Sequence, residues 1–154
     1  MKPNLDEIDR TLLNYLQENA RITNAELARR VELSPPGLQK RVRKLEETGI
    51  IDQYATILNP ELVGYDMICF VQITLVRHKS DFLQNFMHVL QDIPEVLEAY
   101  HITGEYDYLL KVVIRNRKHL ETFILKTLSS LPGMDKVRTS LVLNKIKSTT
   151  AVPI

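Results

Sequence analysis

Basic side chains gather in one short stretch of an otherwise neutral chain. The formal net charge is +1, from 20 Lys and Arg and 19 Asp and Glu, yet residues 29–44 hold six basic residues against the single acid Glu32. Positive charge confined to one place favours a polyanionic partner at that place. The chemistry that Lys and Arg offer there is phosphate binding and hydrogen bonding to guanine in the major groove.

A predicted helix over residues 34–48 would carry this charge on one side. Ser34 is a good N-cap, prolines at the first two helical positions need no intrahelical N–H, and Gly49 suits the left-handed position after the helix. Little bulk at Pro36 and Gly37 would let the backbone approach a ligand closely. The groove contacts expected first are Lys40 and Arg43, and the secondary contacts, mainly to phosphates, are Lys44, Gln39, Arg30 and Ser34.

Two further helices are expected before this one. Apolar residues at helical spacing predict a helix over 5–18, and a Thr23–Glu26 capping box predicts another that starts at Thr23. Only Glu32 and Leu33 separate the second and third helices, so the pattern is a sharp helix-turn-helix whose second helix enters the groove. The β-branched run 50–58 is typical of a short hairpin or wing. A merely solvated basic face is the plain alternative.

Arg41 lies close to the buried side of the expected third helix. Two roles are open for it: an ion pair with an acid of the first helix, such as Asp9, or a contact with DNA.

The second half of the chain predicts strands at 65–76, 96–103, 107–114 and 137–146, with helices at 80–91 and 117–130. This βαββαβ order is that of the ferredoxin-like fold, which makes the whole chain α+β. The predicted domains are residues 1–58 for the helix-turn-helix and 65–154 for the sheet domain, with a linker at 59–64.

Apolar residues on both sides of the first strand point to a homodimer. Ile68, Phe70 and Val76 alternate with the residues expected in the core, and two helices can cover only one face of such a sheet. A second subunit would cover the other face. Loops or the end of the chain are the alternative cover.

Other classes of protein find little support in the residues. No stretch approaches the roughly 18 consecutive apolar residues of a membrane span, and no secretory signal is visible, so we expect a cytoplasmic protein. The lone Cys69 cannot form an internal disulfide or a cysteine-based zinc site and is expected to be buried and inert. The histidines show no metal-ligand spacing and no catalytic motif occurs, so neither a metal nor an enzyme is expected; they are His78, His88, His101 and His119.

Several short motifs, in the same order along the chain, resemble the Lrp/AsnC family of feast/famine transcription regulators. They are Leu5-Asp6-x-x-Asp9-x-x-Leu12-Leu13, Glu26-Leu27-Ala28, Leu33-Ser34-Pro35, Arg41-Val42-x-x-Leu45-Glu46, Gly49-Ile50-Ile51, Thr103-Gly104-Glu105-Tyr106-Asp107-Tyr108, Leu131-Pro132-Gly133 and Ile146-Lys147-Ser148-Thr149-Thr150-Ala151-Val152-Pro153. Each motif is weak alone, and the set is strong. The segment Pro36-Gly37-Leu38-Gln39-Lys40 departs from many relatives, so the operator sequence cannot be borrowed.

The resemblance implies a winged helix-turn-helix joined to a RAM domain, duplex DNA as partner, and dimers that assemble further, commonly to octamers. It implies no cofactor other than an amino-acid effector, bound near the loop between the second and third strands. By position the site would contain Gly104, Tyr106 and Asp107, with Thr103, Thr139, Ser140 and the nearby His101 less certain.

The loop residues suit such a ligand on physical grounds. Backbone N–H groups at Gly104 could bind a carboxylate, and Asp107 could bind an ammonium group. An ordinary hairpin turn is the alternative.

Two other functions remain possible for the whole chain. One is a small dimeric ferredoxin-like α+β-barrel enzyme in which the first sixty residues bind a protein. The other is an amino-acid-sensing module that regulates another protein and binds no DNA. Salt-dependent retention on duplex DNA would distinguish both from a DNA-binding regulator.

Overall fold

The computed structural model describes residues 4–76 and 80–154. Its contacts divide the chain into two compact units, one made of Met1–Ile57 with Lys147–Ile154 and the other of Leu58–Ile146. Within the described residues, no helix combines the length and the apolar character that a membrane crossing needs.

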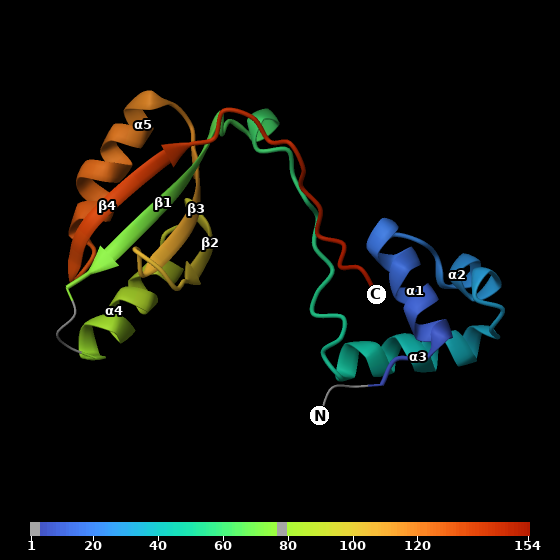
Figure 1. Cartoon of the computed structure of the whole chain (residues 1–154). Helices are drawn as coiled ribbons and strands as arrows, with labels where there is room; N and C mark the ends of the chain where they lie inside the picture. The colour runs from blue at the N-terminus through green and yellow to red at the C-terminus, as the bar shows by residue number, and fades with distance from the viewer. Residues whose placement is uncertain (1–3, 77–79) are drawn as a thin grey trace. The chain divides into compact units, whose positions relative to one another are not determined.

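Three helices form the first unit: α1 (Glu7–Glu18), α2 (Asn24–Arg30) and α3 (Pro35–Glu47) (Figure 1). The predicted caps are confirmed, since Thr23 accepts the Glu26 N–H and Ser34 accepts the Gly37 N–H. The Glu26 carboxylate does not complete a capping box; it binds Arg29 and Arg30 instead. The fully buried centre of the unit comes from all three helices and contains Leu12, Leu27, Leu38 and Leu45.

The turn between α2 and α3 has a left-handed backbone conformation that the sequence does not predict, because no glycine marks it. Glu32 adopts a left-handed conformation with φ 53°, a position that usually holds glycine. The Leu33 N–H reaches the Ala28 carbonyl at 2.9 Å across it, which is the closing bond of a Schellman turn. This turn closes the end of α2 directly before Ser34, the N-cap of α3.

The hairpin expected over residues 50–58 is not formed. Ile50 and Ile51 pack against the helical core, and the described chain then continues without a strand to a 3-10 turn, Glu61–Val63. A β-branched run becomes a strand only when a partner pairs with it, and this unit supplies none among its described residues.

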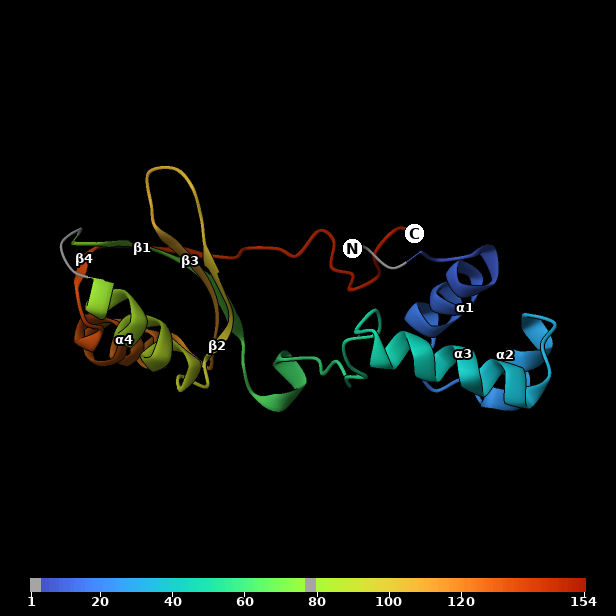
Figure 2. The ribbon, with the colours of Figure 1, turned by 90° about the horizontal axis from the view of Figure 1, so that it is seen from below.

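The second unit is a four-stranded antiparallel sheet of order β2-β3-β1-β4. Its strands are β1 (Met67–Leu75), β2 (Val96–His101), β3 (Tyr108–Ile114) and β4 (Met134–Leu141), with helices α4 (Ser80–Gln91) and α5 (Arg117–Thr122). Figure 2 shows both helices on one face of the sheet. The predicted ferredoxin-like topology is therefore confirmed.

Two elements differ from their predicted form. After α5 the chain continues as a π turn (Phe123–Thr127) and a 3-10 turn (Leu128–Ser130); the wider π turn lets Phe123 and Leu128, five residues apart, both reach the core. β4 starts at Met134, directly after Gly133 with φ 70°. It ends at Leu141, which pairs with Cys69, and one further bond follows, from the Val142 N–H to the Ile68 carbonyl at 2.9 Å.

The sheet face away from the helices is less apolar than the sequence suggested. Ile68 and Phe70 do alternate with the buried Cys69 and Val71, and Phe70 is 37% exposed. Phe70 pairs with Lys111 in the register, and Lys111 forms a 2.6 Å ion pair with Glu98. The face is thus mixed, with aromatic and charged side chains together.

Candidate functional site

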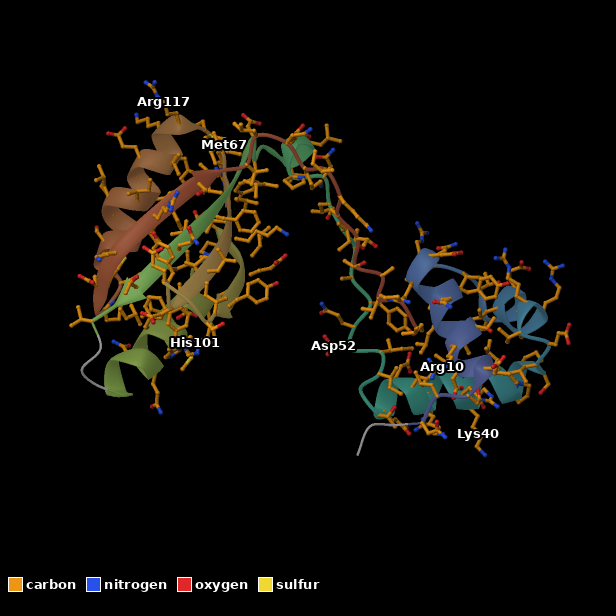
Figure 3. All side chains as sticks on the ribbon, viewed as in Figure 1. Arg10, Lys40, Asp52, Met67, His101 and Arg117 are labelled. Carbon is orange, nitrogen blue, oxygen red and sulfur yellow. The ribbon has the colours of Figure 1, made fainter. Side chains whose placement is uncertain are left out.

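The outer face of α3 presents an exposed basic surface. Lys40, Arg43 and Lys44 are all exposed, and Figure 3 shows Lys40 projecting from α3 away from α1. The predicted contacts Ser34, Pro36 and Gln39 are exposed as well. A helix with such a surface fits the major groove and can reach both phosphates and base edges.

Gly37 leaves room for the side chain that caps the start of α3. A Cβ at Gly37 would lie 3.1 Å from the Ser34 Oγ, the atom that accepts the Gly37 N–H at 3.3 Å. The missing side chain therefore leaves room for the cap, in addition to the close backbone approach expected from the sequence.

Acids share part of the basic surface through exposed ion pairs. Arg43 pairs with Glu47 at 2.8 Å, with both side chains more than half exposed, and Glu26 binds both Arg29 and Arg30. Exposed pairs of this kind contribute little stability. The arginines can therefore exchange their carboxylate for a phosphate at small cost.

Arg41 faces inward and fastens α3 to the start of α1. Its Nη1 lies 2.6 Å from Asp6 Oδ2 and 2.7 Å from Asp9 Oδ1. Asp6 is also the N-cap of α1, with a reciprocal capping box to Asp9. Of the two roles open for Arg41, the structure shows the ion pair, and we call this trio the Arg41 clamp.

The clamp lowers the pKa of Asp6. The Asp9 backbone N–H, and then the Arg41 guanidinium, lower the pKa of Asp6 below its ordinary value. A carboxyl whose pKa is lower in the folded state stabilises that state above its unfolded pKa, and the contribution is lost as pH falls through the lowered value.

A hollow of about 490 Å³ adjoins one flank of α3. Gln39 and Arg43 line it together with Tyr54, whose hydroxyl donates to Glu46 at 3.0 Å. That hydrogen bond holds the segment after α3 against the helix.

The loop between β2 and β3 brings together four of the predicted effector residues, Thr103, Gly104, Tyr106 and Asp107. Gly104 has φ 125°, a conformation that glycine alone adopts readily. The Asp107 carboxylate accepts the Leu75 N–H through Oδ2 at 2.8 Å, and its own N–H donates to the Ile73 carbonyl at 2.9 Å. Asp107 thus ties the loop to the end of β1.

The remaining predicted effector residues do not join that cluster within one chain. His101 ends β2, and its ring stacks on Tyr108 with centroids 4.9 Å apart. β1 lies between β3 and β4, which places Thr139 and Ser140 opposite Val71 and Phe70 and on opposite faces of the sheet. The Thr139 Oγ1 is buried with no hydrogen-bond partner among the described residues.

The other titratable groups have ordinary structural places. Cys69 is fully buried, and burial raises the pKa of its thiol. His119 binds the Arg115 N–H and lies 3.2 Å from Glu95, His88 is exposed, and His78 is outside the described residues. No group of three potential metal ligands occurs in the part of the chain that was described.

A helix-turn-helix with an exposed basic second helix, followed by a ferredoxin-like sheet unit, defines a DNA-binding regulator with a separate ligand-binding domain. Comparison with known proteins agrees. Residues 5–52 match the model of a winged helix-turn-helix DNA-binding domain, and residues 68–152 match that of the Lrp/AsnC ligand binding domain. The chain belongs to the Lrp/AsnC family of transcriptional regulators.

Individual relatives cover nearly the whole chain. The leucine-responsive regulatory protein of Escherichia coli K12 is 38% identical over 97% of this chain and 92% of its own length. A transcriptional regulator of Neisseria meningitidis, solved with L-methionine, has a TM-score of 0.93 and 39% identity over 97% of both chains. A feast or famine regulatory protein of Mycobacterium tuberculosis, also complexed with L-methionine, has a TM-score of 0.84 and 32% identity over 97% of this chain and 99% of that one.

Sequence reasoning missed two parts of the first unit. It did not include Asp6 in the Arg41 clamp, although a capping Asp three residues before another acid was a usable signal. It also missed a contact between Gln17 and Val152, 135 residues apart, for which no local pattern exists.

The Arg41 clamp should be a measurable source of stability. We expect Arg41→Met to lower the free energy of unfolding by about 1–3 kcal/mol, because the buried Asp9 carboxylate loses its charged donor. Urea unfolding followed by the helical circular dichroism signal measures it, with Arg10→Met, an exposed arginine of α1, as control. The difference should shrink as pH falls from about 4, the ordinary pKa of an aspartate, through the lowered pKa of Asp6. Equal stability of both variants would contradict the clamp.

The lone hydroxyl of Thr139 predicts a stabilising substitution. Thr139→Val keeps the shape and removes a buried unpaired hydroxyl, so the free energy of unfolding should rise by about 1 kcal/mol. Chemical denaturation measures it, and Thr139→Ser, which keeps the hydroxyl, should bring no gain. A loss of stability in Thr139→Val would show that the hydroxyl has a partner in solution.

Proposed function

We propose that α3 enters the major groove of duplex DNA as the reading helix of this regulator. Lys40 and Arg43 contact base edges, while phosphates are bound by Lys44, Gln39, Arg30 and Ser34. The observation that carries this proposal is the exposed basic surface of α3, whose opposite side is held to α1 by the Arg41 clamp. A helix with exposed Lys and Arg ends can both position itself on phosphates and read base edges.

We propose a homodimer that assembles further, up to an octamer. The mixed outer face of the sheet supports it, since Phe70 and Tyr100 stay 37% and 49% exposed there, and aromatic residues are enriched in protein interfaces. A twofold dimer would place two reading helices on half-sites about 34 Å apart, or a multiple of that spacing. Because its partner is chromosomal DNA, we place the protein in the cytoplasm.

An amino acid is the effector that we propose for the β2–β3 loop. Two structural relatives were solved with L-methionine, and the loop offers both halves of an amino-acid site. Backbone N–H groups around Gly104 face the carboxylate, and the free Asp107 oxygen faces the ammonium group. Thr103 and Tyr106 belong to the same loop and His101 ends the strand before it, while Thr139 and Ser140 would have to reach the ligand from another subunit.

The DNA-contact proposal is tested by removing two charges from α3. Lys40→Ala with Arg43→Ala should cost about 1–3 kcal/mol of binding for each lost base contact and should relax sequence preference. Fluorescence anisotropy on a selected duplex measures affinity against salt concentration. Arg117→Ala with Lys118→Ala, on α5, removes the same charge and serves as control. Equal losses in both double variants would refute groove reading by α3.

The effector proposal is tested at the carboxylate of Asp107. Asp107→Asn keeps an oxygen for the Leu75 N–H and removes the charge that would bind an ammonium group. A native-state ligand at 100 times its Kd stabilises by about 2.7 kcal/mol, so amino acids that raise the Tm of the wild type should fail to raise that of the variant. Glu105→Gln in the same loop is the control. A full Tm rise in Asp107→Asn would exclude Asp107 as the anchor.

A further inference from the structure

The final residues of the chain pack with the first unit, although the residues just before them belong to the second. Contacts group Lys147–Ile154 with Met1–Ile57, and both ribbon views draw this end beside α1 (Figures 1 and 2). We call residues 147–154 the return segment. It contains no helix or strand, so no backbone hydrogen bonds of regular secondary structure hold it in place.

Gln17 of α1 holds the return segment through both polar atoms of its side chain. Its Nε2 donates to the Val152 carbonyl at 3.0 Å, and its Oε1 accepts the Val152 N–H at 2.6 Å. Neighbouring antiparallel strands exchange the same two bonds between paired residues. The amide of Gln17 therefore recognises an extended backbone as a strand would, and we call this contact the Gln17 clasp.

The return segment is shaped in advance for this contact. Pro153 follows Val152, and a residue before proline is driven to the extended conformation that the clasp requires. Thr149 accepts the Ala151 N–H through its hydroxyl at 3.0 Å, which bends the chain just before Val152. Less conformational freedom is then lost on docking.

We propose that Gln17 is the docking site for the return segment of the same chain, and that the docked segment is a second tether through which the ligand-binding unit restrains α1. The first connection between the units is the continuous chain after Ile57. The second leaves β4 at Val142, whose N–H donates to Ile68 at 2.9 Å, and is complete only while the clasp is closed.

The tether starts next to the strand that the effector loop touches. Asp107 binds the end of β1 at Leu75, which pairs with the start of β4 at Met134. The return segment follows the other end of β4, where Leu141 pairs with Cys69, so the β1–β4 pair links the loop to the segment along β1 from Leu75 to Cys69. A ligand that changes the loop can therefore pull on or release α1, which the Arg41 clamp joins to α3. This coupling rests on the proposed function, whereas the docking itself does not.

Hydrogen exchange tests the docking without DNA or effector. In the full-length protein, Gln17→Leu should speed exchange of the amides in residues 150–154 by roughly tenfold, the effect of losing two hydrogen bonds. Asn14→Leu replaces an exposed amide on the same helix and should leave exchange unchanged. Equal exchange in the two variants would overturn the docking, whatever the DNA measurements show.

The coupling is tested by DNA affinity with and without L-methionine, the ligand of the two structural relatives, or another amino acid that raises the Tm. Gln17→Leu should bind DNA within twofold of the wild type when no effector is present and should keep the effector's Tm rise. It should lose most of the effector-induced change in affinity. A full change in Gln17→Leu overturns the tether while leaving the proposed function intact. If no amino acid alters wild-type DNA affinity, the coupling and the effector proposal fail together, and hydrogen exchange still decides the docking.

A cross-link identifies the chain that supplies the segment. Glu18→Cys with Ala151→Cys, in a Cys69→Ala background, places thiols beside the clasp without altering it, and a short bismaleimide reagent can join them. A product within one chain supports docking in the same chain. A product between two chains would show exchange with a second copy and overturn this assignment.

Discussion

One ion-pair cluster, the Arg41 clamp, orients α3 for the proposed DNA binding. A reading helix is useful only if it keeps a fixed angle to its scaffold, and in a unit of three short helices few contacts can fix that angle. Leu38 and Leu45 bury one side of α3, but apolar contacts are not directional. The guanidinium of Arg41 adds direction, since it binds two carboxylates that already form the capping box of α1.

This arrangement divides the basic residues of the first unit into two groups. Arg41 is bound to the two acids of the α1 capping box, while Lys40, Arg43 and Lys44 stay exposed on the outer side of α3. Weak surface pairs such as Arg43–Glu47 offset the arginine charge locally and are easily replaced by phosphate. In the second unit Asp107 ties its loop to β1 through one carboxylate oxygen, and the proposed ammonium contact would use the other.

Local signals in the sequence predicted local structure well. The starts of α3 and α2 were predicted from their caps, Ser34 with its two prolines and Thr23. The ferredoxin-like order was predicted from strand-like and helix-like apolar patterns that follow one another along the chain. The prediction of a hairpin at 50–58 was wrong because β-branched residues indicate a preference for the strand conformation but do not show that another segment pairs with them. The role of Arg41 stayed open because sequence spacing alone does not say which side chains meet across two helices.

Long-range contacts could not be predicted in the same way. The Asp107–Leu75 bond joins residues 32 apart, and the Gln17 clasp joins residues 135 apart; neither has a local pattern. The exposed charges of α3 could be named from the sequence, but their separation from the inward-facing Arg41 needed the fold. The sequence was thus enough to name candidate residues, whereas the contacts between them had to come from the structure.

Dimethyl sulfate footprinting on duplexes selected from a randomised pool tests whether α3 enters the major groove. The reagent methylates guanine N7 in the major groove and adenine N3 in the minor groove, so it reports which groove the protein covers. The account predicts protection of guanine N7 in two patches about one helical turn apart, or a multiple of it. Protection confined to adenine N3, or no selection of any duplex, would contradict it.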